Sequence, residues 1–198
     1  MSLDSYSGLL ASLAGWLMRD DLAAVLPDFV TLAEADMSHR LRLRAMLTTA
    51  SVSAAGGTLP ADCVAVKSVT LDGTGPLGFA SVAENATLAE TYRGGPPAWW
   101  GIDGDKLVVS PTQASGTVAL RYYARVPALS GGNPTNAILQ ASPALYLYGS
   151  LIQASPYLMD DARVQVWVTL YQEAANLLQA ADDSAEYPGP LAIRPVAW

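Results

Sequence analysis

The sequence is poor in the residues that usually build catalytic and metal sites. Its 198 residues include one cysteine, Cys63, and one histidine, His39. A single cysteine cannot form a disulfide within the chain, and this pattern is typical of a protein made in a reducing compartment. One histidine and one cysteine cannot supply the ligands of a zinc site, and no acidic loop has the spacing of a calcium-binding hand. We therefore expect no metal and no cofactor.

Catalytic motifs are equally scarce. A Ser-His-Asp or Cys-His arrangement would have to use His39, which lies beside Arg40 on the polar side of a predicted helix. Residues 73–78 match the pattern G-x-G-x-x-G after a predicted strand. A dinucleotide site needs a helix to begin there, whereas Pro76 and the residues LGFA predict a turn and another strand. We expect a protein without enzymatic activity.

Charged residues make up only 15% of the chain, where about 25% is ordinary. Eighteen Asp and Glu against eleven Lys and Arg give a net charge of -7, which disfavours nonspecific binding to nucleic acid. So little charge leaves apolar surface exposed on a small monomer, which favours oligomerisation. Prolines interrupt the longest uncharged stretch, residues 126–159, so we expect no membrane span and no membrane partner.

Four stretches show the apolar spacing of amphipathic helices: residues 4–18, 27–47, 143–155 and 160–181. In the second helix the polar side carries Thr31, Glu34, Ser38, His39 and Arg42. The third has apolar residues around most of its circumference and should be buried on most sides. Because each apolar stripe needs a partner, we predict a four-helix bundle, with two N-terminal helices in residues 1–57 and two C-terminal helices in residues 127–182.

From residue 58 to residue 126 the apolar period falls to about 2, which predicts a β-rich insertion. The pattern indicates a strand at 64–71 whose phase slips at a bulge, a hairpin at 102–110 and a one-sided strand at 118–126. Ser81 and Glu84, spaced as in a capping box, predict a short helix between the first strand and the hairpin. The predicted fold class is α+β.

The C-terminal residues 183–198 contain three prolines and no periodic pattern, so we predict an extended arm. Its apolar side chains are candidate anchors for a partner: Leu191, Ile193, Val196 and Trp198. Proline excludes a regular helix or a central strand here. The arm is expected to serve assembly and not the fold of the subunit.

Two further groups are candidates for an interface. Asp36, Arg40 and Arg44 are spaced as an i,i+4 ladder within the apolar arc of the second helix. The ladder is either a set of ion pairs at the margin of the arc or a salt-bridge network across a helix or subunit boundary. Trp99 and Trp100 alternate along a strand, so one of them should face outward.

Three segments of the sequence resemble one protein family. They are SLAGWLMRDDLAAVLPDFVTLAEADMSHRLRLRAM near the N-terminus, LPADCVAVKSVTLDG at 59–73, and RYYARVPALSGGNPTNAILQASPALYLYGSLIQASPYLMDDARVQVWVTLYQEA at 121–174. They resemble the adaptor, or head-to-tail connector, proteins of tailed bacteriophages and related gene-transfer particles. The resemblance extends over nearly the whole chain and includes the order of the predicted elements.

The resemblance implies a structural virion protein, made in the cytoplasm of the bacterial host. It implies a homo-oligomeric ring, typically of twelve copies, beneath the capsid portal, where the C-terminal region reaches toward the portal protein. Such a ring lengthens the DNA channel, through which DNA passes without specific binding, and offers a platform to tail or stopper proteins. Two alternatives stay open: a ligand- or glycan-binding β module that uses Trp99 and Trp100 as a stacking platform, or an enzyme with an unrecognised site.

Overall fold

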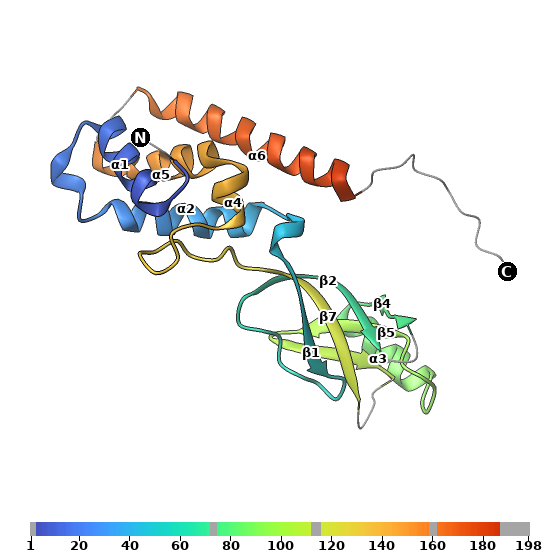
Figure 1. Cartoon of the computed structure of the whole chain (residues 1–198). Helices are drawn as coiled ribbons and strands as arrows, with labels where there is room; N and C mark the ends of the chain where they lie inside the picture. The colour runs from blue at the N-terminus through green and yellow to red at the C-terminus, as the bar shows by residue number, and fades with distance from the viewer. Residues whose placement is uncertain (1–2, 72–74, 112–115, 159–161, 187–198) are drawn as a thin grey trace. The chain divides into compact units, whose positions relative to one another are not determined.

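The structure of the protein, a computed structural model, describes residues 3–71, 75–111, 116–158 and 162–186 (Figure 1). Its internal contacts divide the chain into two compact units. The first, the helical unit, comprises Met1–Ala45 and Val126–Trp198, and the second, the β unit, comprises Met46–Arg125. The chain therefore leaves the helical unit once and returns to it once.

The helical unit is built around one central helix. Its helices are α1 (Tyr6–Leu17), α2 (Leu26–Arg40), α4 (Ala137–Ala141), α5 (Pro143–Leu158) and α6 (Val164–Glu186). Helices α1, α2, α4 and α6 all pack against α5 (Figure 1). Leu145, Tyr146 and Leu151 of α5 are fully buried, which confirms that this apolar helix is covered on most sides.

Local sequence signals explain where these helices begin. Ser5 caps α1 by accepting a hydrogen bond from the N–H of Gly8 at 3.3 Å. Proline in the first turn suits the start of α2, because its missing N–H would have no partner there. Asn136 caps α4 by accepting from the N–H of Leu139 at 2.9 Å. Each cap supplies an acceptor for a backbone donor that the helix itself cannot satisfy.

The β unit contains two sheets and one helix. The first sheet has the order β1-β7-β2-β3, with antiparallel pairs of β1 (Leu47–Ser53), β7 (Thr117–Ala124), β2 (Cys63–Leu71) and β3 (Gly75–Pro76). The second has the order β4-β5-β6, formed by β4 (Gly78–Phe79), β5 (Trp99–Asp103) and β6 (Lys106–Ser110). Helix α3 (Val82–Thr91) packs on β5 and β6. Apolar residues of both sheets, among them Val69, Leu107 and Leu120, form the core of the unit.

Several sequence predictions for the β unit are confirmed. Strand β2 has register shifts against β7, one of them between Val66 and Ser68, where the bulge was expected. Gly104, in the turn of the β5–β6 hairpin, has φ +62°, a conformation that glycine adopts without strain. Ser81 and Glu84 form the predicted capping box at the start of α3.

The predicted four-helix bundle is wrong. The described residues contain six α-helices and seven strands in two sheets, a mixed α+β fold with the strands in the middle of the chain. Helix α4 escaped prediction because five residues are too few to show a helical period. The central position of α5, with four helices against it, also differs from a bundle in which four helices share one core equally.

Helix α2 is shorter than predicted, ending at Arg40 and not at residue 47. The backbone of Leu41 is extended, with ψ 147°, and ends the helix. Strand β1, at Leu47–Ser53, contains the β-branched residues Thr48, Thr49 and Val52. It therefore begins ahead of the predicted start of the β-rich segment at residue 58. Leu41 and Leu43 are both buried, as alternate residues of an extended chain can be. Because the same spacing also fits the edge of a helical arc, the sequence pattern did not reveal that the helix ends at Arg40.

At the other end of the chain, residues 183–186 belong to α6, and the rest of the expected arm, residues 187–198, lies outside the described residues. None of the helices in the described ranges has the length and apolar character needed to cross a membrane.

Candidate interaction surfaces

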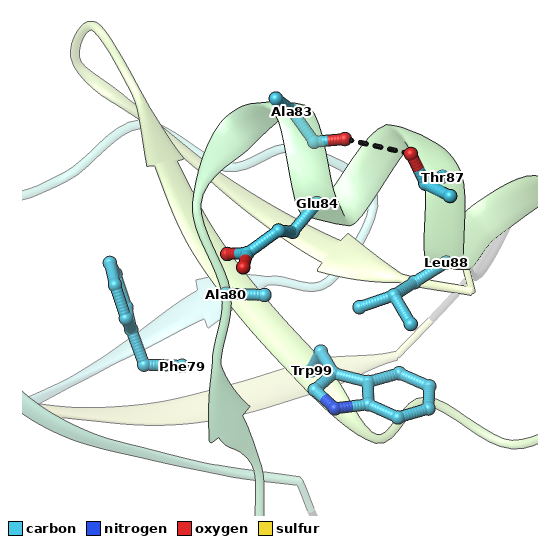
Figure 2. A pocket seen from close by; sticks show the side chains of 7 residues that line it. All are labelled: Phe79, Ala80, Ala83, Glu84, Thr87, Leu88 and Trp99. Atoms are coloured by element: carbon cyan, nitrogen blue, oxygen red, sulfur yellow. Dashed lines mark hydrogen bonds between the residues drawn. The ribbon is translucent and has the colours of Figure 1, made fainter.

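A groove of about 470 Å³ lies on the β unit beside α3. Figure 2 shows its lining: Leu88 of α3 lies near the indole of Trp99, Phe79 stands at the other end, and Glu84 lies between them. The remaining lining residues are Ala80, Ala83 and Thr87. Since most of these side chains are apolar, the groove suits an apolar partner.

Strands β4 and β5 position the two aromatic residues of the groove. Phe79, at the end of β4, is 67% exposed and packs edge-on against Trp100, with ring centroids 5.0 Å apart. Trp99 packs against Tyr92, with ring centroids 5.1 Å apart. A Cβ atom on Gly78 would lie 3.3 Å from the indole of Trp99, so glycine lets the indole lie against the backbone of β4. The aromatic surface is thus held by neighbouring rings on the β4–β5 pair and at the end of α3.

The carboxylate and the hydroxyl that line the groove are already hydrogen-bonded within the β unit. The carboxylate of Glu84 accepts hydrogen bonds from the N–H and the hydroxyl of Ser81, at 2.8 and 2.7 Å, and these bonds lower the pKa of Glu84. The hydroxyl of Thr87 donates to the carbonyl of Ala83 at 3.2 Å (Figure 2). No acceptor among the described residues bonds the indole N–H of Trp99. An incoming segment therefore meets apolar surface and one available donor.

The two tryptophans face opposite ways. Trp100 is 6% exposed and belongs to the core of the β unit, whereas Trp99 is half-buried and lines the groove. Of this pair, Trp99 is the residue that a partner can reach. Alternation alone predicts that one of the two faces outward, but only the packing of β5 against α3 and β6 decides which one.

Asp36, Arg40 and Arg44 do not form one ladder. Arg40 pairs with Asp36 at 2.7 Å along α2, which raises the pKa of the Arg40 guanidinium, and the arginine side chain is 61% exposed. Arg44 lies beyond the end of α2 and pairs instead with Asp182 of α6, at 3.1 Å. The backbone N–H of Arg44 also donates to Asp182, at 2.8 Å.

A glutamine completes the contact between α6 and the segment after α2. The side chain of Gln179 accepts from the N–H of Arg42 at 3.3 Å and donates to its carbonyl at 3.2 Å. Together with Asp182, it satisfies backbone groups of the segment that joins α2 to β1, whose only regular element is a 3-10 turn at Arg44–Met46. The second half of α6 therefore binds the chain just before it enters the β unit.

A buried polar network binds the chain where it returns. Glu34 of α2 is 6% exposed, and its Oε1 accepts from the N–H of Leu129 at 2.8 Å and from the hydroxyl of Tyr146 at 3.2 Å. Ser38, one turn later, accepts from the N–H of Val126 at 3.1 Å. Asn136 donates to the Tyr146 hydroxyl at 2.6 Å. Glu34 and Ser38 belong to the polar side predicted for this helix, and they are buried because the segment from Val126 to Leu129 lies against them.

The second half of helix α6 contains no fully buried side chain. Its 23 residues include two buried side chains, Trp167 and Tyr171, both in the first half. Leu177 is 72% exposed and borders a shallow groove of about 320 Å³. The other residues that line this groove are small or apolar: Ala141, Ser142, Ala144, Ala174, Leu178 and Ala181. Leu177 and this groove form the α6 face, an apolar surface at the helical unit.

A family model decides the identity of the chain. The model described as SU10 adaptor protein matches residues 4–194. The chain belongs to the SU10 adaptor protein family. The resemblance to phage head-to-tail adaptors is thereby confirmed, and the protein is a structural component of a phage virion that interacts with other head and tail proteins. A search of curated proteins finds no match to this chain.

The other residues that the sequence singled out for an interface, for catalysis or for a metal site can now be placed. Leu191, Ile193, Val196 and Trp198 lie outside the described residues. His39 is exposed. Burial of the Cys63 thiol, and to a smaller extent the negative charge of Asp62, raise the pKa of this thiol, which disfavours a reactive thiolate. Within the described ranges, no three His, Cys, Asp or Glu side chains gather in a way that could hold a metal ion.

Proposed function

We propose that this adaptor assembles into a ring, twelve copies in number by its resemblance to the connector family, that joins the capsid portal to the tail and extends the DNA channel. Membership of the SU10 adaptor protein family supports the role of a virion connector. The surfaces described above suggest which parts of the chain make each contact.

The α6 face is the observation that carries this proposal. A helix of 23 residues is about 34 Å long, and from Gln172 to Glu186 this one buries no side chain in its own subunit. Water does not favour an exposed leucine beside a groove of small residues, whereas a neighbouring copy would cover both. Rings form through such contacts between two different surfaces of successive copies.

The other two contacts follow from the remaining surfaces. Residues 187–198 continue directly from α6 and carry the apolar anchors Leu191, Ile193, Val196 and Trp198, and we assign them to the portal protein, which they would bind in extended form. The groove at Trp99 is assigned to a tail or stopper protein. A glycan would need free polar groups beside the indole, and the groove's Glu84 and Thr87 are already bonded.

Native mass measurement of the purified chain, alone and with portal protein, tests the proposal. A ring alone, and a ring-portal complex in the mixture, are expected. Deleting residues 187–198 should keep the ring, the circular dichroism spectrum and Tm, and abolish the portal complex. Leu177→Asp should abolish the ring while leaving the fold intact, because its side chain is exposed.

Asn176→Asp is the matched control, since it adds the same charge to the same helix at an exposed position beside α2, away from the α6 face. A chain that stays monomeric with and without portal would refute the proposed function. If Leu177→Asp and Asn176→Asp both form rings as the unchanged chain does, the α6 face is not the ring contact.

A further inference from the structure

One face of the β1-β7-β2 sheet is basic in an acidic protein. Strands β1, β7 and β2 contain Lys67 and Arg121 and no Asp or Glu. Of the charged residues that directly flank these strands, Arg125 follows β7, and Asp62 and Asp72 flank β2. The carboxylate of Asp62 accepts a hydrogen bond from the hydroxyl of Tyr122, a residue of the opposite, buried face. The acidic residues of the β unit stand outside these three strands: Asp62, Asp72, Glu84, Glu90, Asp103 and Asp105. Since acidic residues outnumber basic ones in the whole chain, this segregation creates a local positive field.

Strand register places these cations on the outer face of the sheet. Val118, Leu120 and Tyr122 of β7 are buried, so the alternate residues Arg121 and Tyr123 point to the opposite face. The amino group of Lys67 lies 5.7 Å from the centre of the Tyr123 ring, which puts Lys67 on the same face.

Arg121 is exposed at the middle of this face. It is directly opposite Thr49 on one side and Ser68 on the other. Neither Arg121 nor Arg125 makes a side-chain ion pair or hydrogen bond with any described residue.

The rest of the face consists largely of hydroxyl groups. Directly opposed residues share a face, and the register adds a second row next to that of Arg121, with Ser51, Ala119 and Thr70, and then the pair Ser53 and Thr117. The row on the other side of Arg121 contains Leu47, Tyr123 and Ala65. The core of a protein interface is enriched in apolar and aromatic residues, and on this face the large ones are confined to that one end. Arginine, lysine, serine, threonine and tyrosine are the side chains that contact phosphate in nucleic-acid complexes.

We propose that this basic sheet face, formed by Lys67, Arg121 and Arg125 with the hydroxyls of Thr49, Ser51, Ser68 and Thr70, contacts the phosphate backbone of duplex DNA without reading its sequence. The inference rests on the proposed function, because the channel of a connector brings DNA to the protein. The alternative occupant is the helical unit of a second copy, which has twice as many acidic as basic residues.

The contact between this face and DNA is weak, because few cations take part in it. Three cations neutralise at most three phosphates for each subunit, so each subunit in contact with the duplex adds about -2.7 to the slope of the logarithm of the binding constant against the logarithm of salt concentration. For one contacting subunit, raising the salt concentration from about 50 to 200 mM weakens binding about 40-fold. A contact of this strength attracts the duplex and still lets it slide.

Fluorescence anisotropy of a labelled, mixed-sequence duplex with the full chain tests the proposal. Arg121→Ser should remove about one third of the slope, so that binding by one contacting subunit weakens only about 12-fold across the same salt range. Lys106→Ser is the matched control, because Lys106 is an exposed cation of the same unit on β6, in the other sheet. It should leave the slope unchanged.

Equal losses in the two variants would show an effect of net charge only and overturn the proposal, as would the absence of salt-dependent binding. Native mass measurement on the same samples separates the remaining cases. If Arg121→Ser dissociates the ring and leaves DNA binding intact, the face binds the acidic helical unit of a second copy, and the proposal fails. Rings with no DNA contact refute this inference alone, whereas DNA contact by a chain that forms neither ring nor portal complex refutes the proposed function alone.

Discussion

Replacing Glu34 with alanine is expected to destabilise the helical unit strongly. The change removes the acceptor of two buried donors, the N–H of Leu129 and the hydroxyl of Tyr146. A buried donor left without an acceptor costs about 1–3 kcal/mol, so the loss of both predicts about 2–6 kcal/mol. In a protein of this size each kcal/mol lowers Tm by about 2–4 °C.

Glu34 also gives the helical unit a pH dependence. Burial raises the pKa of Glu34 above its ordinary value, although the hydrogen bonds from Leu129 and Tyr146 act in the opposite direction. Between the ordinary and the raised pKa the folded state therefore holds more protons than the unfolded state, and the free energy of unfolding falls as pH rises. The contribution is fully present below the ordinary pKa and is lost as pH rises through the raised one. Glu34→Gln, whose amide oxygen accepts the same two bonds without ionising, should remove this decline.

Urea denaturation followed by circular dichroism, from about pH 4 to pH 8 around the ordinary glutamate pKa of about 4.3, measures both effects. Hydrogen exchange of residues 126–136 adds a local readout, and it should accelerate in Glu34→Ala while residues 100–110 of the β unit keep their rates. Glu173, an exposed carboxylate on α6, supplies the matched controls Glu173→Ala and Glu173→Gln. If Glu34→Ala costs no more than Glu173→Ala, the network does not stabilise the unit. If Glu34→Gln costs as much as Glu34→Ala, the ionised carboxylate and not its acceptor geometry is what matters.

Two more predictions concern packing within the helical unit. Asp182→Ala removes the acceptor of two donors on the segment after α2 and should lower the free energy of unfolding by about 1–3 kcal/mol in urea titrations. Glu173→Ala, at an exposed carboxylate of the same helix, should change it by less than about 0.5 kcal/mol. Gly149→Val should cost about 1–3 kcal/mol in thermal melts, because even a Cβ there would lie 3.1 Å from the ring of Tyr171; Gly15→Ala, with open space around it, should raise Tm instead.

Local signals in the sequence predict much of this fold. The capping box at Ser81 and Glu84, the bulge of β2 and the Gly104 turn each depend on a few neighbouring residues, and each is confirmed. The burial of α5 follows from apolar residues all around the helix. In these cases the residues of the segment itself favour one local structure, and contacts with distant parts of the chain do not change it.

The failures share one physical cause, which is that partners distant in sequence decide them. The end of α2 depends on β1 pairing with β7, a contact that overrides a helical spacing continued by Leu41, Leu43 and Leu47. Arg44 pairs across a helix boundary, which is one of the two alternatives that the ladder left open, but the spacing could not identify its partner, Asp182 on α6. Alternation along β5 could not decide between Trp99 and Trp100, since α3 and β6 determine which of them is covered.

Glu34 and Ser38 show why a polar helix face can belong to the interior. The segment that begins at Val126 returns to the helical unit without forming a strand or helix until Asn136 caps α4, so its backbone N–H groups need acceptors from elsewhere. Glu34 and Ser38 stand one turn apart on α2 and meet the N–H groups of Leu129 and Val126. Apolar residues at both positions would extend the stripe of the helix but leave those donors buried and unbonded, at about 1–3 kcal/mol each. The polar side of an amphipathic helix therefore indicates solvent only where no irregular segment of the chain covers it, and amphipathic spacing alone does not reveal such a segment.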